Sequence, residues 1–213
     1  MNTRALVAEF IGTFALIFIG AGAVAIGEGG IVGVAFAHGL VLMVVAFAFG
    51  PISGAHINPA ITIAMWVGKQ VDNATALAYV GAQVVGGVAG AYVLSLVLGG
   101  TTSGLGATTL APGVEPLEGF VLELILTFFL ATTVFNTVVS GKVGSYAPLA
   151  IGMTLTFGIL MGGPLTGGSL NPARTLGPAI LSNQYENIWV YIVGTPLGAI
   201  LAAFVYTSLL KEE

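Results

Sequence analysis

The chain contains no cysteine, and charged residues make up only 7% of its 213 positions. The absence of cysteine excludes disulfides, thiol chemistry and cysteine-built metal sites, and it leaves the redox compartment open. A typical soluble domain carries about 25% charged residues, so water is not the main solvent of this chain. The net charge of −4 is too small to indicate a nucleic-acid partner, and two histidines do not make a metal site. No cofactor is expected.

Apolar stretches dominate what is present, because 56% of the residues are hydrophobic. A membrane-spanning helix needs about 20 mostly apolar residues. Six stretches are long enough, some of them with tilt: 5–26, 31–50, 76–98, 118–140, 146–163 and 187–209. The shorter segments 53–69 and 166–182 begin with glycine and Asn-Pro, which is typical of half-helices that enter the membrane and turn back. The sequence therefore predicts an all-α membrane protein with six transmembrane helices and two re-entrant half-helices.

The basic residues predict an orientation. Six crossings put four of them on one side of the membrane, together with both termini: Arg4, Lys69, Lys142 and Lys211. The positive-inside rule makes that side cytoplasmic. The first apolar run contains Glu9 and lacks a clear cleavage pattern, so we interpret it as a retained helix and not a signal peptide. A cell (plasma) membrane of a microbe is the expected location, with a vacuolar membrane as the alternative.

The two halves of the sequence repeat. Glu9-Phe10-Ile11-Gly12-Thr13-Phe14 matches Glu123-Leu124-Ile125-Leu126-Thr127-Phe128, and Asn58 matches Asn171 at nearly the same separation. Each half has three spanning helices, an odd number, so the second copy enters the membrane upside down. Such inverted repeats place their broken helices and binding site near the midplane. We predict one channel domain made of repeats at about 1–98 and 118–213, joined by an outer loop, 99–117.

The string Asn-Pro-Ala occurs twice, as Asn58-Pro59-Ala60 and Asn171-Pro172-Ala173. Asparagine is a favoured N-cap and proline suits the first helical position, so each copy predicts the start of a half-helix. Inverted symmetry points the two helix N-termini at each other, and each contributes about half a positive charge. We expect each side-chain carbonyl to cap its helix while the NH2 faces a lumen, where this geometry interrupts proton transfer along single-file water. Capping alone is the alternative.

Irregular backbone precedes each Asn-Pro-Ala string. Such backbone is tolerated at membrane depth where it lines a watery cavity. We expect pore-lining carbonyls at Gly54, Ala55, His56, Ile57, Gly167, Ser169 and Leu170. Glu9 and Glu123 occupy matching places in apolar helices and are expected to accept N–H bonds from the loop of their own half. Proton relay or ion binding is the alternative for these carboxylates.

Arg174 breaks the symmetry of the halves, because Ile61 occupies the equivalent position in the first half. Its neighbours are apolar, so a solvated surface position is the weaker interpretation. A charged residue at membrane depth usually marks function. We predict that Arg174 lines one mouth of the pore.

These features resemble the aquaporins of the major intrinsic protein family over essentially the whole chain. The resemblance rests on the paired Asn-Pro-Ala motifs, Glu-x-x-x-Thr-Phe from Glu9 and from Glu123, Ser-Gly-x-His before the first motif, and Arg174 after the second. It implies a right-handed bundle of six helices and two half-helices. It also implies a homotetramer in a lipid bilayer, with one pore in each subunit.

The family's spacing implies an outer selectivity filter of His38, Ile159, Gly168 and Arg174. Without the resemblance, His38 would be interpreted as a buried core histidine. The set is similar to that of plant tonoplast intrinsic proteins, some of which pass ammonia as well as water. Ammonia-passing members carry a further histidine in the outer loop, where this chain has Thr108. Glycerol facilitators carry aspartate after the arginine, where it has Thr175.

The sequence thus predicts a passive, non-enzymatic channel for water that excludes protons and ions. Ile159 and Gly168 are expected to leave room for small neutral solutes such as ammonia or hydrogen peroxide. One alternative is a glycerol or urea facilitator. The other is a structural membrane protein that keeps the fold with a closed pore.

Overall fold

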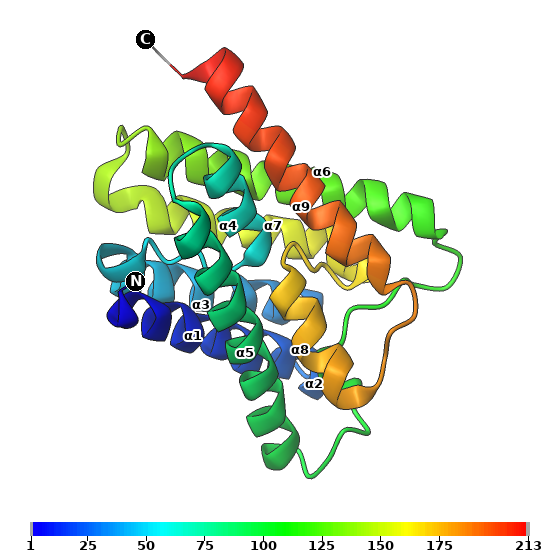
Figure 1. Ribbon diagram of the computed structural model, residues 1–213. Coiled ribbons are helices and arrows are strands. Elements are labelled where there is room, and N and C mark those ends of the chain that lie inside the picture. The colour runs from blue at the N-terminus through cyan, green and yellow to red at the C-terminus, as the bar shows by residue number, and fades with distance from the viewer. Residues whose placement is uncertain (1, 212–213) are drawn as a thin grey trace.

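The structure is a computed structural model that describes residues 2–211, and helices make up most of that range (Figure 1). Six helices are long and apolar enough to cross a membrane: Thr3–Ile26, Gly30–Ser53, Asn73–Val97, Pro116–Val139, Gly144–Thr166 and Ile188–Leu210. Their elements are α1 (Thr3–Leu16), η1 (Ile17–Ala21), α2 (Gly22–Ile26), α3 (Gly30–Ser53), α5 (Asn73–Val97), α6 (Pro116–Val134), η3 (Phe135–Val139), η4 (Gly144–Tyr146), α7 (Ala147–Thr166), α9 (Ile188–Val205) and η5 (Tyr206–Leu210). All six predicted spans are confirmed, with ends that differ by at most three residues.

The two short helices are α4 (Pro59–Val67) and α8 (Pro172–Ser182). The long helices before them, α3 and α7, end at Gly54 with φ 84° and Gly167 with φ 78°. Glycine adopts this left-handed conformation without steric penalty, so it is a common helix terminator. Non-helical segments then run to Asn58 and Asn171, where α4 and α8 begin.

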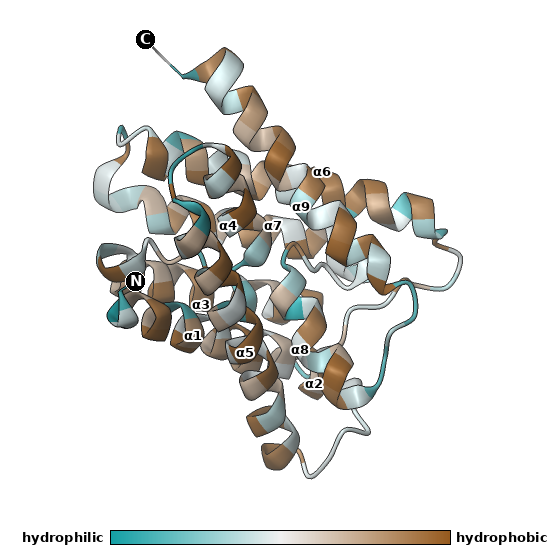
Figure 2. Ribbon diagram, viewed as in Figure 1, coloured by the Kyte–Doolittle hydropathy of each residue, from teal (hydrophilic) through white to brown (hydrophobic). Residues whose placement is uncertain are grey.

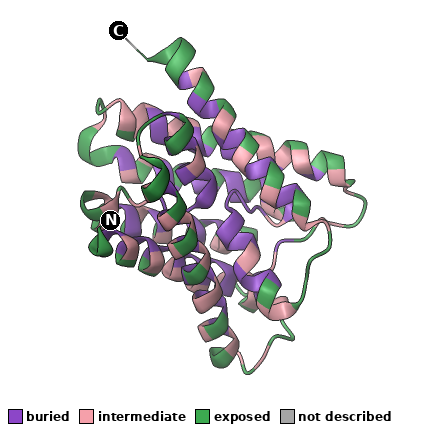
Figure 3. Ribbon diagram, in the orientation of Figure 1, coloured by how far each residue is buried: buried purple, intermediate pink, exposed green. Residues whose placement is uncertain are grey.

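Each half-helix packs mainly on a long helix of the other half. α4 lies against α9 and α8 lies against α5, while α1 packs on α5, α6 on α9 and α3 on α7. In Figure 1 the short helices lie between the long ones, and Figure 3 shows buried residues concentrated along them and the segments before them. The irregular backbone therefore lies in the interior of the bundle.

Glycines permit the closest helix contacts. A Cβ at Gly90 of α5 would lie 2.7 Å from the Phe14 carbonyl oxygen of α1, and one at Gly198 of α9 would clash with the Leu124 carbonyl of α6. Small residues of this kind let helix backbones approach in a membrane. The two contacts join corresponding helix pairs of the two halves.

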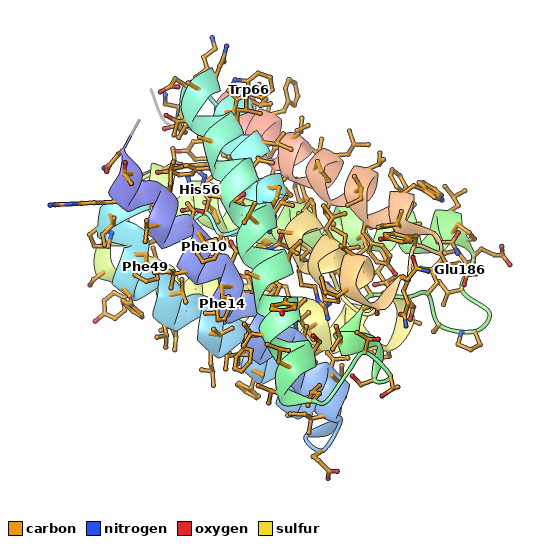
Figure 4. All side chains as sticks on the ribbon, turned by 60° about the horizontal axis from the view of Figure 1, so that its bottom comes forward. Phe10, Phe14, Phe49, His56, Trp66 and Glu186 are labelled. Carbon is orange, nitrogen blue, oxygen red and sulfur yellow. The ribbon has the colours of Figure 1, made fainter. Side chains whose placement is uncertain are left out.

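The outer surface is apolar and the ends of the bundle are polar (Figure 2). Large side chains such as Val44, Leu96 and Phe204 are more than half exposed. The start of α1 and the end of η5 lie at one end of the molecule (Figure 1), and Trp66 and Glu186 lie at opposite ends (Figure 4). Asp72 caps α5 outside the spans, and hydrogen bonds from Thr75 lower the pKa of its carboxyl.

Candidate functional site

Two asparagines cap the half-helices. The Asn58 Oδ1 accepts the Ala60 N–H at 2.9 Å, and the Asn171 Oδ1 accepts the Ala173 N–H at 2.9 Å and the Arg174 N–H at 3.4 Å. Both asparagines have an extended backbone with φ −157°, so the chain turns into the helix immediately after each. The two helix N-termini are built in the same way.

The asparagine NH2 groups join the two halves, which the sequence did not predict. Asn58 Nδ2 donates to the Leu170 carbonyl at 2.7 Å, and Asn171 Nδ2 donates to the Ile57 carbonyl at 2.9 Å. The backbone carbonyl of the residue that precedes each capping asparagine thus accepts a hydrogen bond from the asparagine of the other half. Each NH2 has a second hydrogen, and each carbonyl a second lone pair, that these bonds leave unused.

The segments before the caps hold unusual backbone angles. Ala55, Ile57 and Leu170 have φ of 48°, 54° and 52°. Such left-handed angles are uncommon for residues other than glycine. Ile57 and Leu170 are fully buried, so the surrounding structure must hold these angles in place.

Glu9 supplies this support to the first segment. Its Oε1 accepts from the His56 N–H at 2.9 Å and the Ser53 hydroxyl at 2.6 Å, and its Oε2 accepts from the Ile57 N–H at 2.6 Å and Gln83 Nε2 at 2.7 Å. The carboxylate is fully buried. An ionised carboxylate offers about four acceptor sites, and here all of them have donors.

Glu123 supports the second segment. Its Oε1 accepts from the Ser169 N–H at 2.8 Å and the Thr166 hydroxyl at 2.7 Å, and its Oε2 accepts from the Leu170 N–H at 2.9 Å. The Tyr191 hydroxyl donates to the Thr166 carbonyl at 2.8 Å. Each carboxylate therefore holds the backbone of its own half.

A cavity of about 490 Å³ runs between the helices. Its lining includes both caps and these candidate residues: His38, Gly54, Ala55, His56, Ile57, Ser169, Leu170 and Arg174. The rest of the lining is mostly apolar, with Leu42, Leu130, Ile151 and Leu155 among it. Gly167 is not part of the lining, and its missing side chain would point toward Thr108. Figure 4 shows His56 inside the bundle, in contrast to Trp66.

The four filter candidates divide into two pairs. His38 and Arg174 line the cavity, whereas Ile159 and Gly168 do not. Those two pack together, since a Cβ at Gly168 would lie 2.9 Å from Ile159 Cδ1. Gly168 thereby leaves the space that the Ile159 side chain fills.

His38 and Arg174 present unpaired polar atoms. His38 Nδ1 lies 2.9 Å from the Val34 carbonyl, which only accepts, so Nδ1 carries the hydrogen and Nε2 is a free acceptor. Arg174 Nη1 donates to the Gly106 carbonyl at 2.6 Å. His38 Nε2 and Arg174 Nε and Nη2 are buried and have no hydrogen-bond partner within residues 2–211. Buried polar groups normally have partners, so these unpaired atoms are unusual in residues that line the cavity.

Sequence reasoning gave no role to several residues of this network. Thr62 shares a 3.0 Å hydrogen bond with His56 Nδ1, and Thr175 shares one of 2.7 Å with Ser169 Oγ. Thr62 and Thr175 are 113 residues apart, the same separation as the two caps. A search for identical polar residues 113 positions apart would have identified both threonines as candidates. Gln83 has no such counterpart, so no repeat signal points to it.

In the part of the chain that the structure describes, no group of three or more His, Cys, Asp or Glu residues could hold a metal ion.

Comparison with known proteins places the chain among membrane channels. The family described as major intrinsic protein matches residues 1–206. Glycerol uptake facilitator protein-like 6 of Lactiplantibacillus plantarum is 44% identical over 209 residues, covering 94% of this chain and 95% of that protein. Aquaporin TIP2-1 of Arabidopsis thaliana is 38% identical over 220 residues, covering 96% and 86%. The X-ray structure of the aquaglyceroporin from Plasmodium falciparum superposes with a TM-score of 0.90 at 25% identity, covering 99% and 97% of the two chains.

Proposed function

The chain belongs to the major intrinsic protein family, whose members are membrane channels and not enzymes, and from that premise we propose that it conducts water passively. We infer that it also passes small neutral solutes such as ammonia or hydrogen peroxide. The observation that supports this most strongly is the pair of asparagine caps that are bonded to each other's loops in the wall of a cavity of about 490 Å³.

Exclusion of protons and ions follows from the charges around that cavity. The N-termini of α4 and α8 each contribute about half a positive charge near the caps. The Arg174 guanidinium adds a buried positive charge farther along the cavity. A cation would lose hydration and meet this field, whereas a neutral molecule would meet no such barrier.

The unpaired atoms of the filter suit small polar solutes. Arg174 Nε and Nη2 donate hydrogen bonds and His38 Nε2 accepts one. Water and ammonia can both accept and donate, so either replaces part of its lost hydration there. Of the four filter candidates, His38 and Arg174 are the two that line the cavity, so we expect these two to set the solute range.

Stopped-flow light scattering on proteoliposomes tests this function. Vesicles with the purified protein should shrink faster in an osmotic gradient than empty vesicles, and an entrapped pH dye should show no added proton flux. Parallel measurements with ammonia, urea and glycerol define the solute range. Shrinkage equal to that of empty vesicles would contradict the proposal and favour a structural protein with a closed pore.

A glycerol or urea facilitator is the second candidate. It is favoured by the relative from L. plantarum, whose name is that of a glycerol uptake facilitator. Thr175 opposes it on the sequence resemblance, because glycerol facilitators carry aspartate there. Glycerol permeability close to that of water in the same vesicles would make this the better description.

We further propose a homotetramer in the cell membrane with both ends of the chain in the cytoplasm. The exposed apolar side chains on the long helices provide a surface that lipid or another subunit must cover. The basic residues Arg4, Lys69 and Lys211 give the orientation by the positive-inside rule. Native mass spectrometry tests the assembly, and protease access to tags at the two ends tests the orientation.

A further inference from the structure

Gly20 lies directly behind His38. A Cβ at Gly20 would lie 2.6 Å from His38 Cδ2, 2.7 Å from Nε2 and 2.9 Å from Cγ. These distances are shorter than real Cβ contacts, so the imidazole ring occupies the space that any side chain at Gly20 would need. Because position 20 has no side chain, the His38 ring can pack directly against the backbone of η1.

Two contacts restrict the position of the His38 ring. Its Nδ1 is bonded to the Val34 carbonyl of the same helix at 2.9 Å, which holds the ring at that nitrogen. Gly20 blocks the side toward η1, and His38 is also part of the cavity lining. We therefore expect a methyl group at position 20 to displace the ring away from η1 and to narrow the cavity that His38 lines.

The η1 segment also contacts the outer loop, whose Gly106 carbonyl binds the Arg174 side chain. Ala21, next to Gly20, has its carbonyl so close to Gly106 that a Cβ at Gly106 would clash with it. The Gly106 carbonyl in turn accepts the Arg174 Nη1 hydrogen at 2.6 Å. One π-helical turn, Ile17–Ala21, thus contacts His38 through Gly20, and through Ala21 it contacts the glycine that binds Arg174. Short π-helical turns inside α-helices are frequent at functional sites.

We propose that Gly20 is a positioning residue that determines solute size selectivity by setting the depth of the His38 ring. This inference rests on the proposed function, because it needs a conducting pore with His38 in its constriction. Position 20 tolerates only a hydrogen if the lumen is to keep its width.

The test compares Gly20→Ala with Gly22→Ala in proteoliposomes. Both glycines are buried in the first spanning helix, and neither has a left-handed φ, so alanine suits the backbone at each. A Cβ at Gly22 would lie 3.3 Å from Leu94 Cδ1, away from His38, which makes it a matched control. The readouts are water and urea permeability.

Gly20→Ala should lower the ratio of urea to water permeability by about tenfold, the effect of one methyl group in a tight site. Gly22→Ala should leave the ratio unchanged. In a His38→Ala background, Gly20→Ala should have no effect, because no ring remains to be displaced. If the wild type passes no urea, the same comparison is made on water permeability.

Three results would overturn the role of Gly20. One is an unchanged ratio in Gly20→Ala while His38→Ala alters it, and another is an equal drop with and without His38. If Gly20→Ala does not fold, the double variant with His38→Ala should restore folding, and its failure to do so is the third. A wild type that conducts neither water nor urea would instead contradict the proposed function.

Discussion

The two non-helical segments before the caps, 54–58 and 167–171, perform the same task with different partners. In both, a buried carboxylate accepts two consecutive backbone N–H groups. The first segment adds Gln83 from α5, whose Nε2 bonds Glu9 at 2.7 Å and Thr62 at 2.8 Å. The second adds Thr108 from the outer loop, whose hydroxyl lies 2.9 Å from that of Thr175. One support is therefore internal to the bundle, and the other depends on a connecting loop.

The comparison distinguishes contacts that both halves need, those of the buried carboxylates, from contacts that occur in one half only. The carboxylates occur in both halves because any irregular segment at this depth needs its amides bonded. Arg174 and its bond to Gly106 occur only in the second half. The outer loop therefore reaches both Arg174, through Gly106, and the second segment, through Thr108. The first segment is supported by Glu9 and Gln83 of its own half.

The largest expected effect comes from removing a carboxylate. Glu9→Ala leaves two buried amides and two side-chain donors without an acceptor, and each unpaired group costs about 1–3 kcal/mol. Glu123→Ala leaves two backbone N–H groups unpaired, while the Thr166 hydroxyl can still donate to the Gly162 carbonyl, so it should destabilise less. Thermal unfolding in detergent and water permeability should both show this order. Glu28→Ala, on an exposed turn, is the control, and equal melting of Glu9→Ala and Glu28→Ala would contradict the assigned support.

The next effect in size tests the asymmetry of the mouths. Arg174→Val removes the buried charge and the donors of the candidate filter, so urea or glycerol permeability should rise by about tenfold. Cation flux is a second readout. Ile61→Val, at the equivalent place in the first half, should leave solute selectivity as it is. Unchanged selectivity in Arg174→Val would remove this residue from the filter.

A smaller effect distinguishes the two added partners. Gln83→Leu leaves one acceptor site of Glu9 empty and breaks the link to Thr62, so it should cost about 1–2 kcal/mol. Thr108→Val removes one bond between hydroxyl groups and should cost about 1 kcal/mol. Unfolding in detergent measures both. Ser95→Ala, which removes an exposed hydrogen bond to the Tyr92 carbonyl within α5, is the control. A larger loss in Thr108→Val would reverse the order of the two supports.

The last prediction is that mercurial reagents have no effect on the wild type. The wild type has no cysteine, so mercurial reagents should leave its water permeability unchanged. His56→Cys and Ser169→Cys occupy equivalent places in the two segments, and both positions line the cavity. Each should make the channel sensitive, which supplies the positive control. Rapid inhibition of the wild type, reversed by thiols, would contradict the expectation.

The architecture could be predicted because the membrane restricts the possible structures so strongly. Apolar length gave the six spans, and the duplicated Asn-Pro pairs gave the two half-helices, since few structures satisfy buried backbone at that depth. The partners of the caps could not be predicted. The bonds from Asn58 to Leu170 and from Asn171 to Ile57 depend on how the halves meet in space. Single-copy contributors such as Gln83 and Gly106 leave no periodic or repeated signal.

The reciprocal bonds of the caps also constrain the order of biogenesis. They join residues 112 and 114 positions apart, and α4 packs on α9, which is synthesised well after it. Contacts so distant in sequence form late, after the intervening chain has been ordered. The first half therefore leaves the ribosome with α4 supported by α5 alone, and the packing of α4 is complete only when α9 arrives.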